Sequence, residues 1–432
     1  MLDIKQLIRN KFLISSGIVL VGSTFANFVN YFYNLVLGRI LDPVSYGEVA
    51  AYVTLAMIIV VPAGTLATLV TKYISEYSAS GDHQKVRAIY RSSVRWALSA
   101  GFLLLIIFLA LSPLISSYLK TSLTPTIVFA FFLPISLIAA SSKGTLQGLH
   151  EFFPITVTNA IESLGKLIFA VVFVYLGWGV AGAVGGILAG SILAYLYSII
   201  KIRNSLPTDN VKMSETEPFF KGIPKYVYII FLSTLCLSVF GNIDVVLAKH
   251  YLSEHSAGQY AALAVLGRIV TYGSIAIITV LLPMAAATGN DEKKAKKLLL
   301  TSIAFTILIA GVIIFFFYTF PNFTINLLFG ADYLEVAPYL GLFGLIMLLG
   351  SLSKTFVNYF IARHQTYFIY PFIVTTIVQI ILIVLFHENI RQIVNILLIT
   401  NILLLISQIV IYFLAPQTRI MDQESAETIA HV

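Results

Sequence analysis

Long apolar stretches alternate with short polar ones along the whole chain of 432 residues. Twelve of these stretches approach the ~20 residues that an α-helix needs to cross the hydrocarbon core of a bilayer. The sequence therefore predicts an all-α integral membrane protein with twelve transmembrane helices. The predicted spans are 12–37, 48–71, 96–118, 124–148, 154–176, 179–200, 226–248, 260–284, 298–320, 336–361, 367–386 and 393–414.

The composition indicates the same class. Hydrophobic residues make up 58% of the chain and charged residues 11%, whereas a soluble domain is about 25% charged. These values exclude a soluble enzyme, a nucleic-acid-binding module and a secreted disulfide scaffold. The single cysteine, Cys236, cannot form an intrachain disulfide. The sequence has no metal-ligand spacing and no GxxxxGK[ST] nucleotide-binding loop, so we expect no catalytic activity, cofactor or metal.

Lysine and arginine are distributed unevenly among the predicted loops. Nineteen of the 27 lie on the side that holds both termini, and four lie on the opposite side. Basic residues accumulate in the cytoplasmic loops of membrane proteins, so we expect a multi-pass protein of the cell membrane with both termini in the cytoplasm. The net charge of +7 then needs no nucleic-acid partner. The other four basic residues fall within predicted spans; they are Lys143, Lys166, Arg268 and Lys354.

The chain repeats itself at a spacing near 210 residues. Three motifs recur at equivalent places: Leu37-Gly38-Arg39 and Leu247-Ala248-Lys249, Gly81-Asp82 and Gly289-Asn290, and Ser142-Lys143 and Ser353-Lys354. Six spans per half return the chain to the side where it began, so the two six-helix repeats are predicted to be parallel. We expect a lobe at 1–200, a cytoplasmic linker at 201–225, a second lobe at 226–414 and a cytoplasmic tail at 415–432.

One motif points to a family. The first hundred residues contain Asn34-x3-Gly38-Arg39-x-Leu41-x-Pro43-x2-Tyr46-Gly47, then Lys72-Tyr73-x-Ser75-Glu76 and Gly81-Asp82. This pattern resembles the prokaryotic polysaccharide-biosynthesis flippases, the Wzx-like O-antigen branch of the multidrug/oligosaccharidyl-lipid/polysaccharide (MOP) exporter superfamily. The resemblance implies two lobes around a central cavity that move polyprenyl-diphosphate-linked oligosaccharides out of the cytoplasmic leaflet. It also implies membrane lipids as partners, with biosynthetic glycosyltransferases or a polymerase as further candidates.

Charged residues inside predicted spans are candidate site residues, because burying them in a membrane costs free energy. Glu162 and Lys166 lie four residues apart on one helical face. They form either a self-neutralising pair or a cavity wall that contacts substrate or a coupling cation. Arg268 has no acid within one helical turn and suits bidentate binding of a diphosphate. The alternatives for Arg268 are snorkelling and an ion pair with an acid on another helix.

Five further charged residues occupy repeat-equivalent places. Lys143 and Lys354 are predicted either to anchor the cytoplasmic ends of their spans or to line the inner mouth of the cavity. Arg39, Asp244 and Lys249 lie at the predicted external ends of spans 1 and 7. They could form a gate of ion pairs in the closed state or contact lipid headgroups.

The first span carries a polar stripe. Asn27, Asn30 and Asn34 follow the spacing of one helical face, together with Tyr31. Side-chain amides can bind sugar hydroxyls, or they can form hydrogen bonds between helices. Both roles fit a helix that lines a cavity.

Three features are expected to be structural. Gly182, Gly186 and Gly190 repeat at the spacing that favours close helix packing. Pro62 is expected to weaken its helix. The segment 81–95, with three arginines on one face, is predicted as a short separate helix at the membrane interface.

The sequence as a whole favours a flippase for lipid-diphosphate-linked oligosaccharides that works by alternating access. The alternative is a cation-coupled multidrug or metabolite antiporter of the same superfamily, which would need a cavity rich in carboxylates. A membrane glycosyltransferase or polymerase is disfavoured, because no predicted external loop is long enough for its catalytic site.

Overall fold

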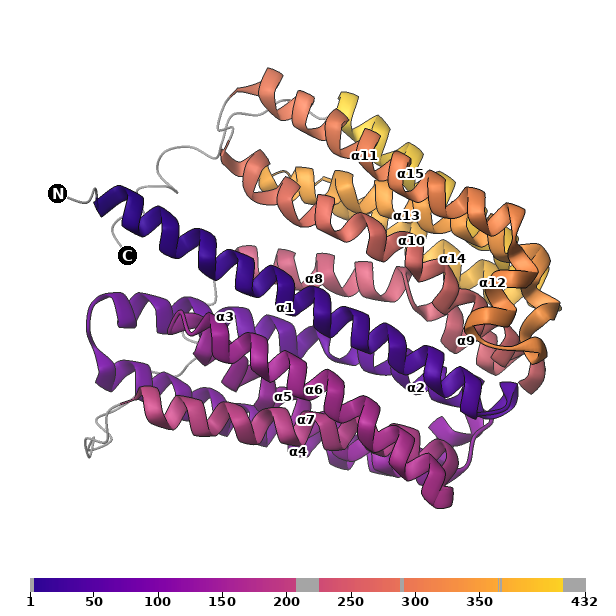
Figure 1. Cartoon of the computed structure of the whole chain (residues 1–432), viewed down its shortest axis with the longest axis horizontal. Helices are drawn as coiled ribbons and strands as arrows, with labels where there is room; N and C mark the ends of the chain where they lie inside the picture. The colour runs from indigo at the N-terminus through magenta and orange to yellow at the C-terminus, as the bar shows by residue number, and fades with distance from the viewer. Residues whose placement is uncertain (1–3, 207–224, 288–290, 364, 366, 415–432) are drawn as a thin grey trace. The chain divides into compact units, whose positions relative to one another are not determined.

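The computed structural model describes residues 4–206, 225–287, 291–363, 365 and 367–414, and this part of the chain is helical without a strand (Figure 1). The chain divides into two compact units, Met1–Leu235 and Cys236–Val432, called unit 1 and unit 2 below. Residues 207–224 of the predicted linker and the predicted tail at 415–432 lie outside the described residues.

The helices of unit 1 are α1 (Ile4–Ile40), α2 (Pro43–Ile59), α3 (Val61–Ala79), α4 (His83–Tyr118), α5 (Leu123–Gly148), α6 (Phe152–Phe173), the π-helix η1 (Val174–Trp178) and α7 (Gly179–Ser205). Helix α8 (Lys225–Phe240) crosses the boundary between the units. Those of unit 2 are α9 (Ile243–Tyr251), α10 (Glu254–Ala287), α11 (Glu292–Thr319), α12 (Pro321–Leu328), the 3-10 helix η2 (Ala331–Val336), α13 (Ala337–Ala362), α14 (Ile369–Leu385) and α15 (Ile390–Leu414).

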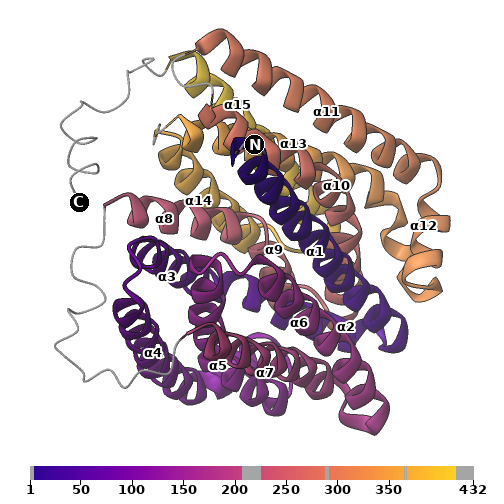
Figure 2. The same cartoon turned by 60° about the vertical axis from the view of Figure 1, so that its left-hand side comes forward.

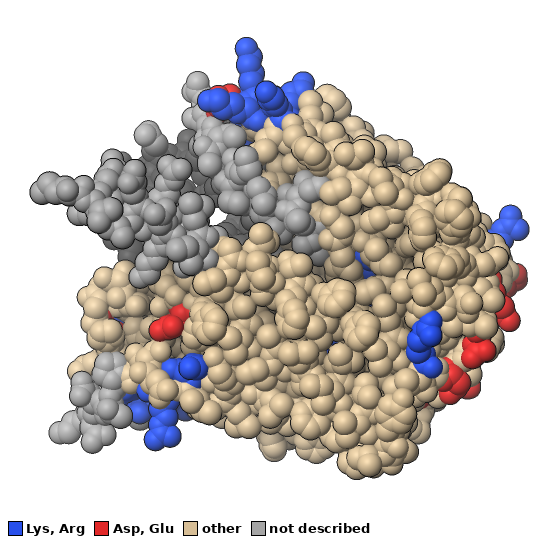
Figure 3. Space-filling model, in the orientation of Figure 1, with Lys and Arg blue, Asp and Glu red and all other residues tan. Residues whose placement is uncertain are grey.

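These helices confirm the predicted all-α membrane fold. Among the described residues, seven helices are long and apolar enough to cross a membrane, or eight if the bent pair Phe231–Phe240 and Ile243–Tyr251 forms one span. Every predicted span falls on helix, and the count of twelve crossings stays a prediction. Large apolar side chains such as Phe102, Leu103 and Leu114 on α4 point outward, and charged side chains form only small groups on the visible face (Figure 3).

Two local predictions have different outcomes. The helix is interrupted at Val60, where α2 ends and α3 begins just before Pro62, so the predicted weakness is confirmed. The separate interfacial helix at 81–95 is wrong, because this segment is the first part of the continuous helix α4. The Asp82 side chain accepts the backbone N–H of Lys85 at 2.9 Å and caps α4. No proline interrupts the helix before Pro113, so it runs on into the apolar stretch.

The packing of α7 on α6 depends on the glycine face of α7. A Cβ atom added at Gly186 would lie 2.5 Å from the backbone nitrogen of Ala170, and one at Gly190 would lie 2.5 Å from that of Lys166. Only glycine lets the two backbones approach so closely. The predicted close-packing face is therefore confirmed. Figure 2 shows α6 and α7 side by side along their length.

The two units repeat the same local contacts. Asp82 caps α4 through Lys85, and Asp291 caps α11 by accepting the backbone N–H of Lys294 at 3.0 Å. The sequence had matched Asp82 to Asn290, so that register was wrong by one residue; Asn290 itself lies outside the described residues. Just after the end of α4, the Thr121 hydroxyl donates to Glu48 on α2. The Gln259 amide donates to the Asp332 carbonyl with the same separation of 73 residues.

Candidate functional site

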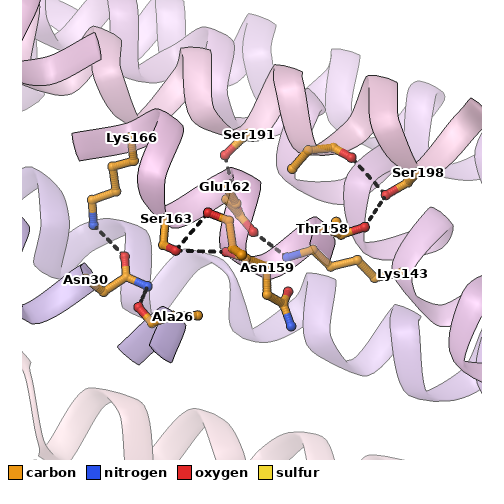
Figure 4. Close-up of polar contacts among 12 residues, drawn as sticks. Ala26, Asn30, Lys143, Thr158, Asn159, Glu162, Ser163, Lys166, Ser191 and Ser198 are labelled. Carbon is orange, nitrogen blue, oxygen red and sulfur yellow. Dashed lines mark hydrogen bonds and ion pairs between the residues drawn. The ribbon is translucent and has the colours of Figure 1, made fainter. Parts of the chain in front are cut away.

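A half-buried ion pair lies in the middle of unit 1. The Lys143 ammonium on α5 donates to the Glu162 carboxylate on α6, and the Ser191 hydroxyl on α7 donates to the other carboxylate oxygen at 3.3 Å (Figure 4). Of their side-chain areas, Lys143 keeps 27% and Glu162 33% exposed. Of the two alternatives for Glu162 and Lys166, the self-neutralising pair is not observed: Lys143 contacts this carboxylate from a neighbouring helix, and the Lys166 side chain extends toward α1. The cavity wall that contacts substrate or a coupling cation stays a prediction.

Lys166 is held by neutral groups. Its Nζ donates to Oδ1 of Asn30 at 3.1 Å and lies 4.0 Å from the centre of the Tyr33 ring. The Tyr33 hydroxyl in turn donates to the Ala183 carbonyl on α7 at 3.0 Å. Within the described residues, Lys166 makes no ion pair at contact distance, although it lies within electrostatic range of Glu162. The ammonium group of Lys166 therefore lies beside neutral side chains, while the carboxylate of Glu162 contacts Lys143 instead.

The predicted polar stripe of α1 splits into three environments. Asn30 contacts Lys166 and also donates to the Ala26 carbonyl at 2.9 Å, so its side chain is fixed in orientation. Asn34 is buried and donates to the Asn30 carbonyl within the same helix. Asn27 is exposed. Tyr33 was not among the predicted site residues, although it lies three residues after Asn30 and so shares its face of α1.

Unit 2 holds a different polar cluster. The Tyr260 hydroxyl donates to the buried Asp244 carboxylate at 2.5 Å, and Arg268 donates to Oδ1 of Asn242 at 3.0 Å. The Arg268 guanidinium also lies within electrostatic range of Asp244 and of Lys354 on α13. Arg268 thus has an acid nearby on another helix, which is one of the alternatives that the sequence left open.

The predicted gate involves both units. Asp244 and Lys249 are buried on the short helix α9, and Arg39 is exposed near the end of α1 in unit 1. The contact described for Asp244 is with Tyr260 of its own unit. The gate of ion pairs with Arg39 therefore stays a prediction, as does the central cavity between the two halves.

One buried glutamine was missed by the sequence analysis. In α6 the Thr158 hydroxyl donates to the Pro154 carbonyl, and in α14 the Thr375 hydroxyl donates to the Pro371 carbonyl. The same spacing continues in both helices, so Gln379 has the place in the sequence of α14 that Glu162 has in α6. Gln379 accepts the Thr400 hydroxyl of α15 at 3.5 Å, as Glu162 accepts the hydroxyl of Ser191. The shared Pro-x3-Thr-x3 spacing was the signal that could have found it.

A separate pocket lies at the start of α2, α5 and α7. Its volume is about 860 Å³, and one carboxylate, Glu48, faces mostly apolar side chains. The predicted site residues are not among its lining. Its other lining residues are Ser122, Thr124, Val128, Phe173, Trp178, Val180, Ala181, Gly185, Leu188, Ala189 and Ile192. In the part of the chain that the structure describes, no three His, Cys, Asp or Glu residues lie close enough to hold a metal.

Comparison with known proteins identifies the family. The family model for polysaccharide biosynthesis protein matches residues 13–289, well over half of the chain. The chain belongs to the polysaccharide biosynthesis protein family. Stage V sporulation protein B of Bacillus subtilis (strain 168) is 24% identical over 140 residues, which is 31% of this chain and 27% of that relative.

Solved structures of MOP transporters share the fold. One is an inward-facing multidrug resistance transporter of the MATE family, with a TM-score of 0.72 and 16% identity over 90% of this chain and 93% of that chain. Another is the lipid II flippase MurJ in an inward closed conformation, with a TM-score of 0.68 and 16% identity over 95% of both chains. The polysaccharide biosynthesis family and the MOP transporter fold are thus confirmed, and the chain is a multi-pass membrane protein.

Proposed function

We propose that this polysaccharide biosynthesis protein is a flippase for polyprenyl-diphosphate-linked oligosaccharides. It moves the glycan from the cytoplasmic to the outer leaflet of the cell membrane by alternating access, with both termini in the cytoplasm and without catalysis. A glycan head carries many hydroxyl groups, and each costs several kcal/mol if it enters hydrocarbon without a partner. A protein with polar groups in its spans removes that cost.

The observation that carries this proposal is Lys166. Lys166 lies near the middle of a predicted span, and among the described residues its side chain contacts an amide and an aromatic ring. A cation in such a place costs free energy, and such residues usually mark a substrate path. A diphosphate can supply the missing negative charge. Asn30 presents an amide beside the same cation, where a sugar hydroxyl can bind.

The test is export by vesicles that contain the purified full chain and a lipid-linked oligosaccharide. We expect Lys166→Ala to reduce the appearance of glycan on the outer face at least tenfold, because a charge-assisted bond contributes about 1.5–3 kcal/mol. Arg268→Ala removes the second candidate cation and should also reduce export. Arg268→Lys should restore only part of the export, because lysine lacks the bidentate fork.

A matched control is Lys201→Ala, which removes another lysine that lies over a tyrosine ring, at 5.5 Å from Tyr197. This variant should export normally. Normal export by Lys166→Ala and Arg268→Ala would contradict the proposal. Uptake or extrusion of a cationic drug in exchange for protons or sodium, with no glycan movement, would favour the antiporter alternative.

A further inference from the structure

We propose that Glu162 is a resident counter-ion, whose carboxylate occupies the position at Lys143 that the substrate diphosphate takes during transport. This inference rests on the proposed flippase function and names the groups that exchange. It concerns an ion pair within unit 1 that the sequence did not predict.

The ion pair is accessible enough for such an exchange. Roughly a third of the Glu162 side chain and a quarter of the Lys143 side chain remain exposed. A sealed ion pair could be replaced only by unfolding its surroundings, whereas a half-exposed one can change partners. The Ser191 hydroxyl donates to Glu162 in this structure. The same hydroxyl could donate to a phosphate oxygen equally well.

The counterpart of Glu162 in the second half of the chain is neutral. Gln379 stands opposite Glu162 in the repeat, and it accepts a hydroxyl from the following helix without any charge. It is fully buried and also donates to the Phe240 carbonyl at 3.1 Å. In unit 2 an amide therefore occupies the counterpart position. The charge of Glu162 needs a different explanation, because ion pairs taken out of water often add little stability.

The charges around Glu162 match the proposed ligand. Lys143 and Lys166 lie on opposite sides of the carboxylate in the close-up (Figure 4). With Glu162 in place, these three residues carry one net positive charge. Each phosphate of a diester carries one negative charge, so a diphosphate diester carries about two. Displacing Glu162 from Lys143 presents two ammonium groups to two phosphates, and its return to Lys143 favours release.

If the carboxylate and the diphosphate exchange at Lys143, substitutions of Glu162 and of Lys143 should change diphosphate affinity in opposite directions. Glu162→Gln leaves Lys143 without its carboxylate, so farnesyl diphosphate, used as the probe, should bind about tenfold more tightly, equivalent to about 1.4 kcal/mol. Lys143→Met leaves Glu162 without its cation, so the probe should bind about tenfold more weakly. The double variant should fall between the two. Binding is measured on the purified full chain in detergent, with inorganic pyrophosphate as competitor.

Export kinetics should distinguish an effect on substrate release from an effect on substrate binding. Glu162→Gln is expected to lower both the half-saturating substrate concentration and the maximal export rate, because the bound diphosphate has no carboxylate to replace it. Thermal unfolding provides the folding control, and Glu162→Gln should unfold within a few degrees of the unaltered chain, since glutamine serves at the equivalent position.

Two results would overturn the inference. The first is unchanged or weaker binding of the probe by a folded Glu162→Gln protein. The second is weaker binding by both single variants, which would indicate that the ion pair only supports the structure. If the unaltered chain binds no diphosphate and Lys166→Ala exports normally, the proposed function itself fails and the exchange fails with it.

Discussion

Unit 1 has glutamate at two contacts where unit 2 has glutamine. Glu48 accepts a hydroxyl hydrogen from Thr121, and its counterpart Gln259 donates to a backbone carbonyl at the same separation along the chain. Glu162 and Gln379 form the second such pair. Both pairs occupy matching places in the two halves, although Glu48 accepts a hydrogen bond where Gln259 donates one. At these two contacts the negative charge is present in unit 1 alone.

The close helix pair of unit 1 differs from its counterpart in the same way. Gly190 precedes Ser191 on α7, whereas Ile399 precedes Thr400 on α15, and α15 contains no glycine. Gly190 packs directly on the backbone beside Glu162 and Lys166. The charged cluster and the glycine face therefore occur together, in unit 1. A helix pair without charges to align can keep ordinary side chains at its interface.

The largest effect is expected from filling that glycine face. Gly190→Ala places a Cβ atom 2.5 Å from the Lys166 nitrogen and 2.6 Å from the Glu162 carbonyl oxygen, and neither backbone atom can move aside alone. We expect α6 to shift and the protein to lose about 1–3 kcal/mol of stability, together with most of its export. Thermal unfolding and vesicle export measure the two effects.

The matched control for this variant is Gly311→Ala in unit 2, where no atom lies within 4 Å of the added Cβ. It should leave both measurements unchanged. If Gly190→Ala behaved like Gly311→Ala, close approach of α7 would not be what positions the charged cluster.

A smaller effect is expected at Tyr33, which supports Lys166 from α1. Tyr33→Leu removes the ring beneath the ammonium, and cation–π contacts contribute about 0.5–2 kcal/mol, so diphosphate binding should weaken by about two- to thirtyfold. Tyr33→Phe keeps the ring and loses only the hydroxyl that donates to Ala183, so it should restore most of the binding. A Phe variant as weak as the Leu variant would show that the ring is not what holds Lys166.

The smallest effect is expected at the aspartate helix caps that both units share. The backbone N–H of Lys85 lowers the pKa of Asp82, and that of Lys294 lowers the pKa of Asp291. A carboxyl with a lowered folded pKa stabilises the protein above its unfolded pKa of about 3.9 and loses this effect as the pH falls through the folded value. Asp82→Asn and Asp291→Asn keep a capping side chain and should each flatten the acid end of a plot of unfolding temperature against pH. Unequal flattening by the two variants would show that the caps are not equivalent.

Much of the fold could be predicted from the sequence, because hydrophobic length and helix-packing glycines are local signals. The break beside Pro62 and the tight face from Gly182 to Gly190 follow from single residues with known backbone effects. The extension of α4 to His83 was missed. Its polar first turns look like a loop when apolar length is the only criterion, although Asp82 followed by Lys85 supplies a cap.

The site was predicted less well, because its contacts join different helices. Glu162, Lys166 and Lys143 were all identified as candidates, but spacing along one helix relates Glu162 to Lys166 and gives no sign of its contact with Lys143. Partner choice depends on which neighbouring helix approaches each side chain, and Lys143 lies 19 residues from Glu162 along the chain. Tyr33 and Gln379 were missed because the contacts that matter join different helices: the Tyr33 ring lies under the Lys166 ammonium, and Gln379 accepts the Thr400 hydroxyl.

The alternation of glutamate and glutamine has a consequence for how such chains change over generations. The codons of these two amino acids differ only in their first base, so a single nucleotide substitution exchanges a charge for an amide of nearly the same shape. At Glu162 and Gln379 the side-chain oxygen accepts a hydroxyl hydrogen in both cases, and that contact is available to either amino acid. A duplicated transporter can therefore redistribute charge between its halves one base at a time, and the substrate it carries can change while its architecture does not.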